Sequence, residues 1–109
     1  MSVPRTPRSP VPRPVSTELR RVVERWRQLP LDHALSHAGR VRALVQSLAD
    51  VVAEANGIAA SVVPDIGPAT LMDQLTVLVH DASAAAVTPT LAVTSTLAED
   101  LARLRRELA

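Results

Sequence analysis

Three histidines, His33, His37 and His80, are the residues of this sequence best suited to metal binding or proton transfer. His33 and His37 are four residues apart, a spacing that places two imidazoles on one side of a helix and suits a shared Zn²⁺ ion. A third ligand would have to be His80. In the helix expected around it, His80 lies with Asp73 and Thr76 on the side away from the apolar face that must pack. We therefore expect no metal site, and a histidine–metal enzyme is only a remote alternative.

The amino-acid composition excludes most other catalytic mechanisms. The chain contains no Cys and no Lys, which excludes a thiol nucleophile, a disulfide and Schiff-base chemistry. Its serines have no Gly-x-Ser-x-Gly context, and its three glycines are not grouped into a phosphate-binding loop. We therefore predict that the protein is not an enzyme and holds no cofactor.

Arginines are concentrated near the N-terminus. Residues 1–29 hold seven Arg against two Glu, whereas residues 30–109 hold five Arg against nine acidic residues. A cationic segment of this kind attracts an acidic protein surface or phosphate groups. The candidate contact residues are Arg5, Arg8, Arg13, Arg20, Arg21 and Arg27. In the alternative interpretation, they form a solvated helix face on which Glu24 pairs with Arg20 and Arg27.

A nucleic-acid-associated protein that makes non-specific phosphate contacts through this cluster is the main alternative function. Trp26 is the only aromatic residue, so a stacking platform for single-stranded nucleic acid is not expected. A helix-turn-helix is not expected either, because the basic helix is the first one and residues 43–98 contain no Arg.

Prolines set the N-terminal segment apart from the remaining chain. They occupy positions 4, 7, 10, 12 and 14, where each ring fixes φ and disfavours helix at the residue before it. We predict a disordered, basic, proline-rich tail over residues 1–16, with Ser16 or Thr17 as the N-cap of the first helix. Residues 17–109 are predicted to form a single domain.

Apolar residues recur at helical spacing along that domain. Helices are predicted over residues 18–29, 32–55, 68–88 and 89–108. We expect Pro30 to end the first helix, Asp32 to cap the second and Asn56-Gly57 to end it. Val51 falls on the apolar arc of the second helix. The stretch 75–79 also has the composition of a strand, but the apolar arc continues on both sides of it, which favours helix. The predicted fold is an all-α antiparallel bundle of three to four helices.

The second half of the chain indicates self-association. Leucines in residues 97–108 follow a narrow stripe with spacings of four, three and four, typical of helix–helix contacts. Residues 68–98 carry only Asp73 and Asp81 as charged groups, fewer than a small bundle usually exposes. The candidate self-association residues are Val77, Val87, Leu91, Leu97, Leu101, Leu104 and Leu108. The alternative is that the leucine stripe packs inside the chain's own bundle.

Taken together, these features predict a non-catalytic helical interaction or scaffold protein that forms a homo-oligomer, most simply a dimer. The helices in the second half would make the self-contact, and the Arg-rich N-terminal segment would face an acidic partner. The longest charge-free run, residues 82–98, is short for a membrane span and contains Pro89. We therefore expect a cytoplasmic protein, and its use of Arg without Lys is typical of GC-rich bacteria.

Overall fold

The computed structural model describes residues 10–85 and 91–109, and for residues 91–95 it describes the backbone alone. The elements are α1 (Arg13–Gln28), α2 (Leu31–Ala55), the 3-10 turn η1 (Pro68–Thr70), α3 (Leu71–Ala85) and α4 (Leu91–Glu107). Within these ranges all regular structure is helical, which confirms the all-α prediction, and residues 75–79 belong to a helix. Residues 1–9 of the tail predicted over residues 1–16, and the predicted helix start at Pro89, lie outside the described residues. In the part of the chain described, no helix is both long and apolar enough to cross a membrane.

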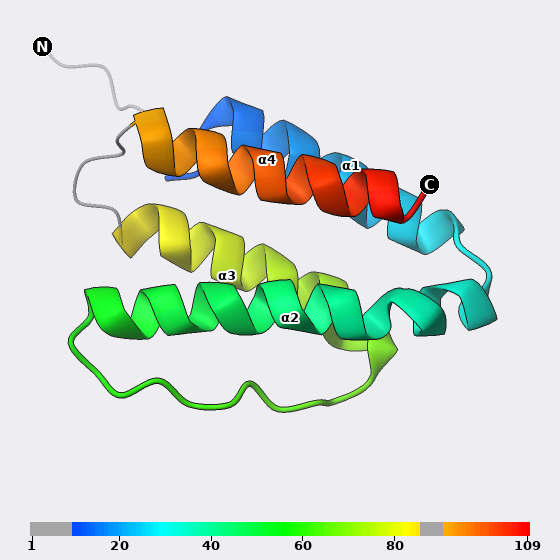
Figure 1. Cartoon of the computed structure of the whole chain (residues 1–109), viewed down its shortest axis with the longest axis horizontal. Helices are drawn as coiled ribbons and strands as arrows, with labels where there is room; N and C mark the ends of the chain where they lie inside the picture. Colours follow the sequence, from blue (N-terminus) through cyan, green and yellow to red (C-terminus); the bar gives the residue numbers. More distant parts are fainter. Residues whose placement is uncertain (1–9, 86–90) are drawn as a thin grey trace, which may run out of the picture.

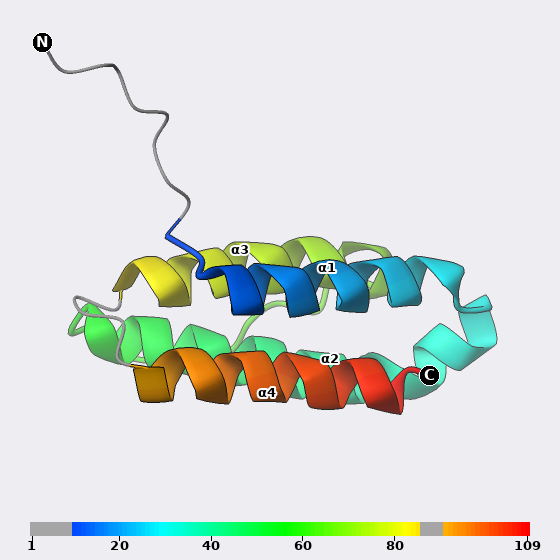
Figure 2. The ribbon, with the colours of Figure 1, turned by 90° about the horizontal axis from the view of Figure 1, so that it is seen from above.

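The helices form two layers, each of which is a pair of parallel helices. α1 packs on α4, α2 packs on α3, and α1 also touches α3. The α1–α4 layer runs in the opposite direction to the α2–α3 layer (Figures 1 and 2). The predicted helical bundle is therefore confirmed, and in the described ranges it contains four helices. Its antiparallel arrangement holds between the two layers, whereas the two helices within each layer are parallel.

α2 ends where the sequence predicts. Gly57 has a φ of +67°, a conformation that glycine adopts without strain. Its N–H donates to the carbonyl of Glu54 at 3.1 Å, and the N–H of Ile58 donates to the carbonyl of Ala53 at 3.0 Å. These two bonds form a Schellman motif, which satisfies the last carbonyls of the helix and turns the chain away from its axis.

A long extended connection makes α2 and α3 parallel. Residues 56–67, called the strap below, run back along α2 before α3 begins (Figure 1). An extended chain advances about 3.3 Å per residue, whereas a helix advances about 1.5 Å. The strap is therefore long enough to return the chain along much of α2, and α3 then follows the same direction as α2.

α1 begins earlier than predicted. The helix starts at Arg13, with Pro12 at the N-cap position and Pro14 in the first turn. Proline is tolerated there because the first N–H groups of a helix have no acceptor within it. Val15 is fully buried, and the Ser16 hydroxyl donates to the Arg13 carbonyl at 3.0 Å instead of capping the helix. The folded domain therefore includes this turn, and the predicted tail is correspondingly shorter.

The short connection between α1 and α2 turns at a proline. α1 ends at Gln28, which confirms that Pro30 stops the first helix. The first backbone bond of α2 runs from the Ala34 N–H to the Pro30 carbonyl at 2.9 Å. Asp32 lies in the first turn and makes no capping bond, so the predicted cap at Asp32 is wrong. The N-cap position belongs to Pro30, and the Asp32 carboxylate is left to interact with the positive end of the helix dipole.

One apolar core lies between the layers and draws on all four helices. Its most deeply buried side chains are Val15, Val22, Val41, Val45, Leu71, Leu75, Val79, Leu101, Leu104 and Leu108. Trp26, only 9% exposed, also belongs to it. The expected apolar arcs supply these residues, but Val51 is an exception because it is half-exposed. Val51 follows Arg40 by eleven residues, close to three full turns, and therefore lies on the same side of α2 as Arg40, whose guanidinium pairs with Glu107 of α4.

Candidate interaction surfaces

Gln46 on α2 fixes the middle of the strap. Its side-chain oxygen accepts a hydrogen bond from the Val63 N–H at 2.8 Å. Its amide nitrogen donates to the Ser61 carbonyl and to the Asp50 carboxylate, each at 2.9 Å. One side chain thus satisfies two backbone groups of the strap, which have no strand or helix partner of their own.

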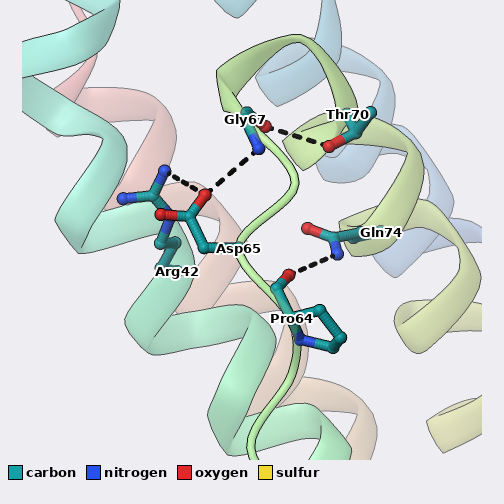
Figure 3. Close-up of polar contacts among 6 residues, drawn as sticks. All are labelled: Arg42, Pro64, Asp65, Gly67, Thr70 and Gln74. Carbon is teal, nitrogen blue, oxygen red and sulfur yellow. Dashed lines mark hydrogen bonds and ion pairs between the residues drawn. The ribbon is translucent and has the colours of Figure 1, made fainter.

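The end of the strap is tied to both helices that it connects (Figure 3). Asp65 Oδ1 accepts from Arg42 Nη2 at 2.7 Å and from the Gly67 N–H at 3.1 Å. On the other side, the Gln74 amide of α3 donates to the Pro64 carbonyl at 3.1 Å. The strap is therefore a positioned element, and the side chains that it directs outward have a defined place on the surface.

Several of those outward side chains are apolar. Val63 packs against the core, whereas its neighbour Val62 is 85% exposed and Ile66 is 62% exposed. On α3, Val77 is 57% exposed, and it lines a shallow groove of about 470 Å³ together with Ile66 and Leu78. We call the exposed residues Val62, Ile66 and Val77 the strap–α3 surface. Aliphatic groups from two elements are thus placed around one groove.

In the α1–α4 layer, a largely buried carboxylate joins the two helices. Glu18 on α1 accepts from Arg105 Nε of α4 at 2.9 Å and from Arg21 Nη1 at 3.2 Å. Near the other end of the pair, Arg25 Nε donates to the Leu108 carbonyl at 3.0 Å. The pairing of Glu24 with Arg20 and Arg27, which the alternative interpretation of the sequence requires, is not among the ion pairs of the described residues. The chain instead uses Glu18, which the parallel α4 places beside Arg105.

A second shallow groove lies on the surface between α1 and α4, and we call it the α1–α4 groove. It has a volume of about 430 Å³, and its lining includes Pro14 and Thr17 from α1 and Ala98 and Ala102 from α4. Small side chains leave this space because they do not fill the gap between two adjacent helices. Arg13 lies at its edge.

The predicted anion contacts fall into separate groups. Arg5 and Arg8 lie outside the described residues. Arg21 is held by the Glu18 carboxylate. Arg13, Arg20 and Arg27 are exposed, and none of them forms an ion pair with another residue that the structure describes. Their seven-residue spacing places all three on the side of α1 that faces away from the core.

The structure covers the leucine stripe with the chain's own helices. Leu97 is almost completely buried, and Leu101, Leu104 and Leu108 have no exposed surface. In this fold the stripe therefore fills the core of one chain and is not offered to a second copy. A stripe with this spacing packs equally well within a chain or between chains, which is why the sequence left both possibilities open. The side chains of Val87 and Leu91 lie outside those described, and only Val77 of this predicted set is placed on the surface.

The histidines are not assembled into one site. The rings of His33 and His37 lie 5.2 Å apart between centroids, as expected for successive turns of α2. His80 lies on α3, where its Nδ1 is 3.7 Å from Asp81 Oδ1, and both side chains are about half exposed. Within the described ranges, no cluster of three His, Cys, Asp or Glu residues has the geometry to hold a metal ion.

Comparison with known proteins adds no family assignment. No protein-family model, curated protein or solved structure matches this chain. The function is therefore inferred from the surfaces described above.

Proposed function

We propose that the protein is a non-catalytic, cytoplasmic interaction protein that self-associates, with the dimer as its smallest assembly. The observation that supports this most directly is the strap–α3 surface. Val62, Ile66 and Val77 expose aliphatic groups, and the last two line one groove. Hydrogen bonds hold the strap that carries Val62 and Ile66. Covering such a patch removes apolar surface from water, which stabilises the contact by about 25 cal/mol for each Å² buried.

The charge distribution around this surface supports the same proposal. Asp73 and Asp81 are the only charged residues of α3 apart from the titratable His80. Long charged side chains on the surface normally keep small bundles soluble and prevent them from associating. α3 contains no Arg that could have this effect. A second copy of the chain would cover this sparsely charged face.

The substitution Val77→Asp tests the proposal. We expect the wild-type chain to show a mass above 11.6 kDa by light scattering after size exclusion, increasing with concentration. The aspartate variant is expected to remain at the monomer mass, because docking would move its carboxylate from water into an apolar contact. Its melting temperature is expected to change little, since position 77 is exposed in the single chain.

Val51→Asp is the matched control. Val51 is also a half-exposed valine on a helix, but it lies on the side of α2 that carries Arg40, away from the strap. This variant is expected to associate like the wild type. A wild-type chain that stays monomeric at every concentration would refute self-association. Equal loss of association in both variants would show that this surface is not the one used.

A second candidate function is supported by the arginines of α1 that make no ion pair with a residue the structure describes. Arg13, Arg20 and Arg27 project from one side of the helix, and phosphate groups are suitable partners for them. The protein would then associate with nucleic acid through the backbone, without base recognition.

A gel shift with duplex DNA, repeated at low and high salt, tests this candidate. Binding is expected to weaken steeply with salt and to be lost when Arg20 and Arg27 are both changed to Ala, because each phosphate contact releases counterions. Lysine at both positions is the control, since it keeps the charge. Binding that is indifferent to salt would exclude this mechanism, and so would the absence of binding at low salt.

A further inference from the structure

The two helix layers carry opposite net charges. The α1–α4 layer, taken as residues 10–29 and 91–109, has eight Arg against five acidic residues, a net charge of +3. The α2–α3 layer, taken as residues 30–85, has two Arg against six acidic residues, a net charge of −4. We call these the Arg layer and the acid layer. The bundle is therefore positively charged on one side and negatively charged on the other. In Figure 1 the Arg layer is at the top and the acid layer is below it.

On both layers, charged groups lie on the outer side. Arg13, Arg20 and Arg27 occupy the outer side of α1 and make no ion pair with a described residue. On α3, Asp73 and Asp81 are exposed, and Val77 lies midway between them at intervals of four residues. Residues four apart follow one side of a helix, so this acidic line runs past the strap–α3 surface.

Both layers also offer apolar side chains for a contact. The acid layer exposes Val62, Ile66 and Val77, and the last two line a shallow groove. The Arg layer presents the α1–α4 groove, whose lining includes Ala98 and Ala102 beside Glu18 and Glu99. A contact between the layers would therefore cover apolar area on both sides.

We infer that a second copy docks head to tail, with the acid layer of one chain on the Arg layer of the next. This inference rests on the proposed self-association and specifies its geometry. A two-fold contact through the strap–α3 surface would bring two layers of net charge −4 together, whereas the head-to-tail contact pairs opposite charges. The contact is heterologous, so each assembled pair keeps one free layer at each end and grows beyond the dimer unless a ring closes.

Two charge-reversed chains test the geometry. The first carries Arg13→Glu, Arg20→Glu and Arg27→Glu, which changes its Arg layer from +3 to −3. The second carries Glu54→Arg, Asp73→Arg and Asp81→Arg, which changes its acid layer from −4 to +2. All six positions are exposed, so both chains are expected to fold, as circular dichroism melting would verify.

Each reversed chain is expected to lose self-association, with an apparent Kd raised about tenfold or more, because both of its layers now have the same sign. An equimolar mixture of the two is expected to associate, since every layer of one chain is opposite in sign to every layer of the other. Lysine at positions 13, 20 and 27 is the control that keeps the charge and should preserve association.

The outcomes separate this geometry from the proposed function. If the wild type associates and the first reversed chain associates equally well, the head-to-tail contact is refuted while self-association stands, because a two-fold contact through α3 leaves α1 unused. If the wild type is monomeric throughout, self-association itself is refuted. Failure of the mixture to associate when both chains are folded would also overturn the pairing of opposite layers.

Discussion

The substitution Leu101→Asp is expected to unfold the whole chain. Leu101 has no exposed surface and lies in the core shared by all four helices. Removing a buried leucine side chain costs about 2–5 kcal/mol, and a buried unpaired carboxylate adds several kcal/mol. Together these costs are comparable with the entire stability of a small domain, about 5–15 kcal/mol.

The measurement is a thermal melt followed by circular dichroism and by the fluorescence of Trp26, the only tryptophan. We expect no cooperative transition and a red-shifted emission at low temperature, because Trp26 loses its buried environment. Leu101→Met keeps the volume and is expected to cost less than about 1.5 kcal/mol. Leu31→Asp introduces the same charge at an exposed leucine and should melt like the wild type. A folded Leu101→Asp monomer that has lost only its ability to oligomerise would assign the stripe to a contact between chains.

The second large effect is expected for Trp26→Ala. Trp26 is the largest side chain of the core, and no Phe or Tyr is present to share its role. Truncation of a buried aromatic side chain to alanine costs about 3–5 kcal/mol, through lost burial and through the cavity that remains. The free energy of unfolding from a urea titration, followed by circular dichroism, measures the loss.

Leu35→Ala provides the comparison for that truncation. Leu35 is a half-exposed apolar residue in the second turn of α2, so its truncation leaves no cavity, and the expected change is within about 0.5 kcal/mol. If both substitutions had similarly small effects on the free energy of unfolding, Trp26 would not be a core residue.

The proposed assembly follows from how the chain divides its charge. Within one molecule, Glu18 pairs with both Arg21 and Arg105, and Arg40 on α2 pairs with Glu107 on α4 at 2.8 Å. The pairs made by Arg105 and by Glu107 join different helices. Among the described residues, the charged groups outside these ion pairs are net positive on the Arg layer, even though they include Glu24 and Glu99, and net negative on the acid layer. This difference in net charge favours contact between unlike layers of neighbouring copies.

The surfaces were only partly predictable. The exposure of Val77 follows from its place opposite the apolar arc of its helix. The sequence contains only weak signals for the strap, since Asn56-Gly57 and Pro64 predict a loop but not its route along α2. The bond between Arg42 and Asp65 spans 23 residues, and the one between Glu18 and Arg105 spans 87. Contacts at such separations depend on which helices become neighbours, and apolar periodicity carries no information about that choice.

What the sequence determined by itself is local. Helical periodicity defined the apolar faces, Pro30 and Gly57 set helix ends through backbone geometry, and the absence of Cys and Lys excluded whole chemistries. The tertiary structure decided that α1 lies parallel to α4, that the leucine stripe faces inward and that the two layers of described helices carry opposite net charges. The physical reason is that each helix has an apolar face that any other apolar face can cover. The pairing of helices is selected only when all four pack around one core and the strap leads the chain back along α2 to the start of α3.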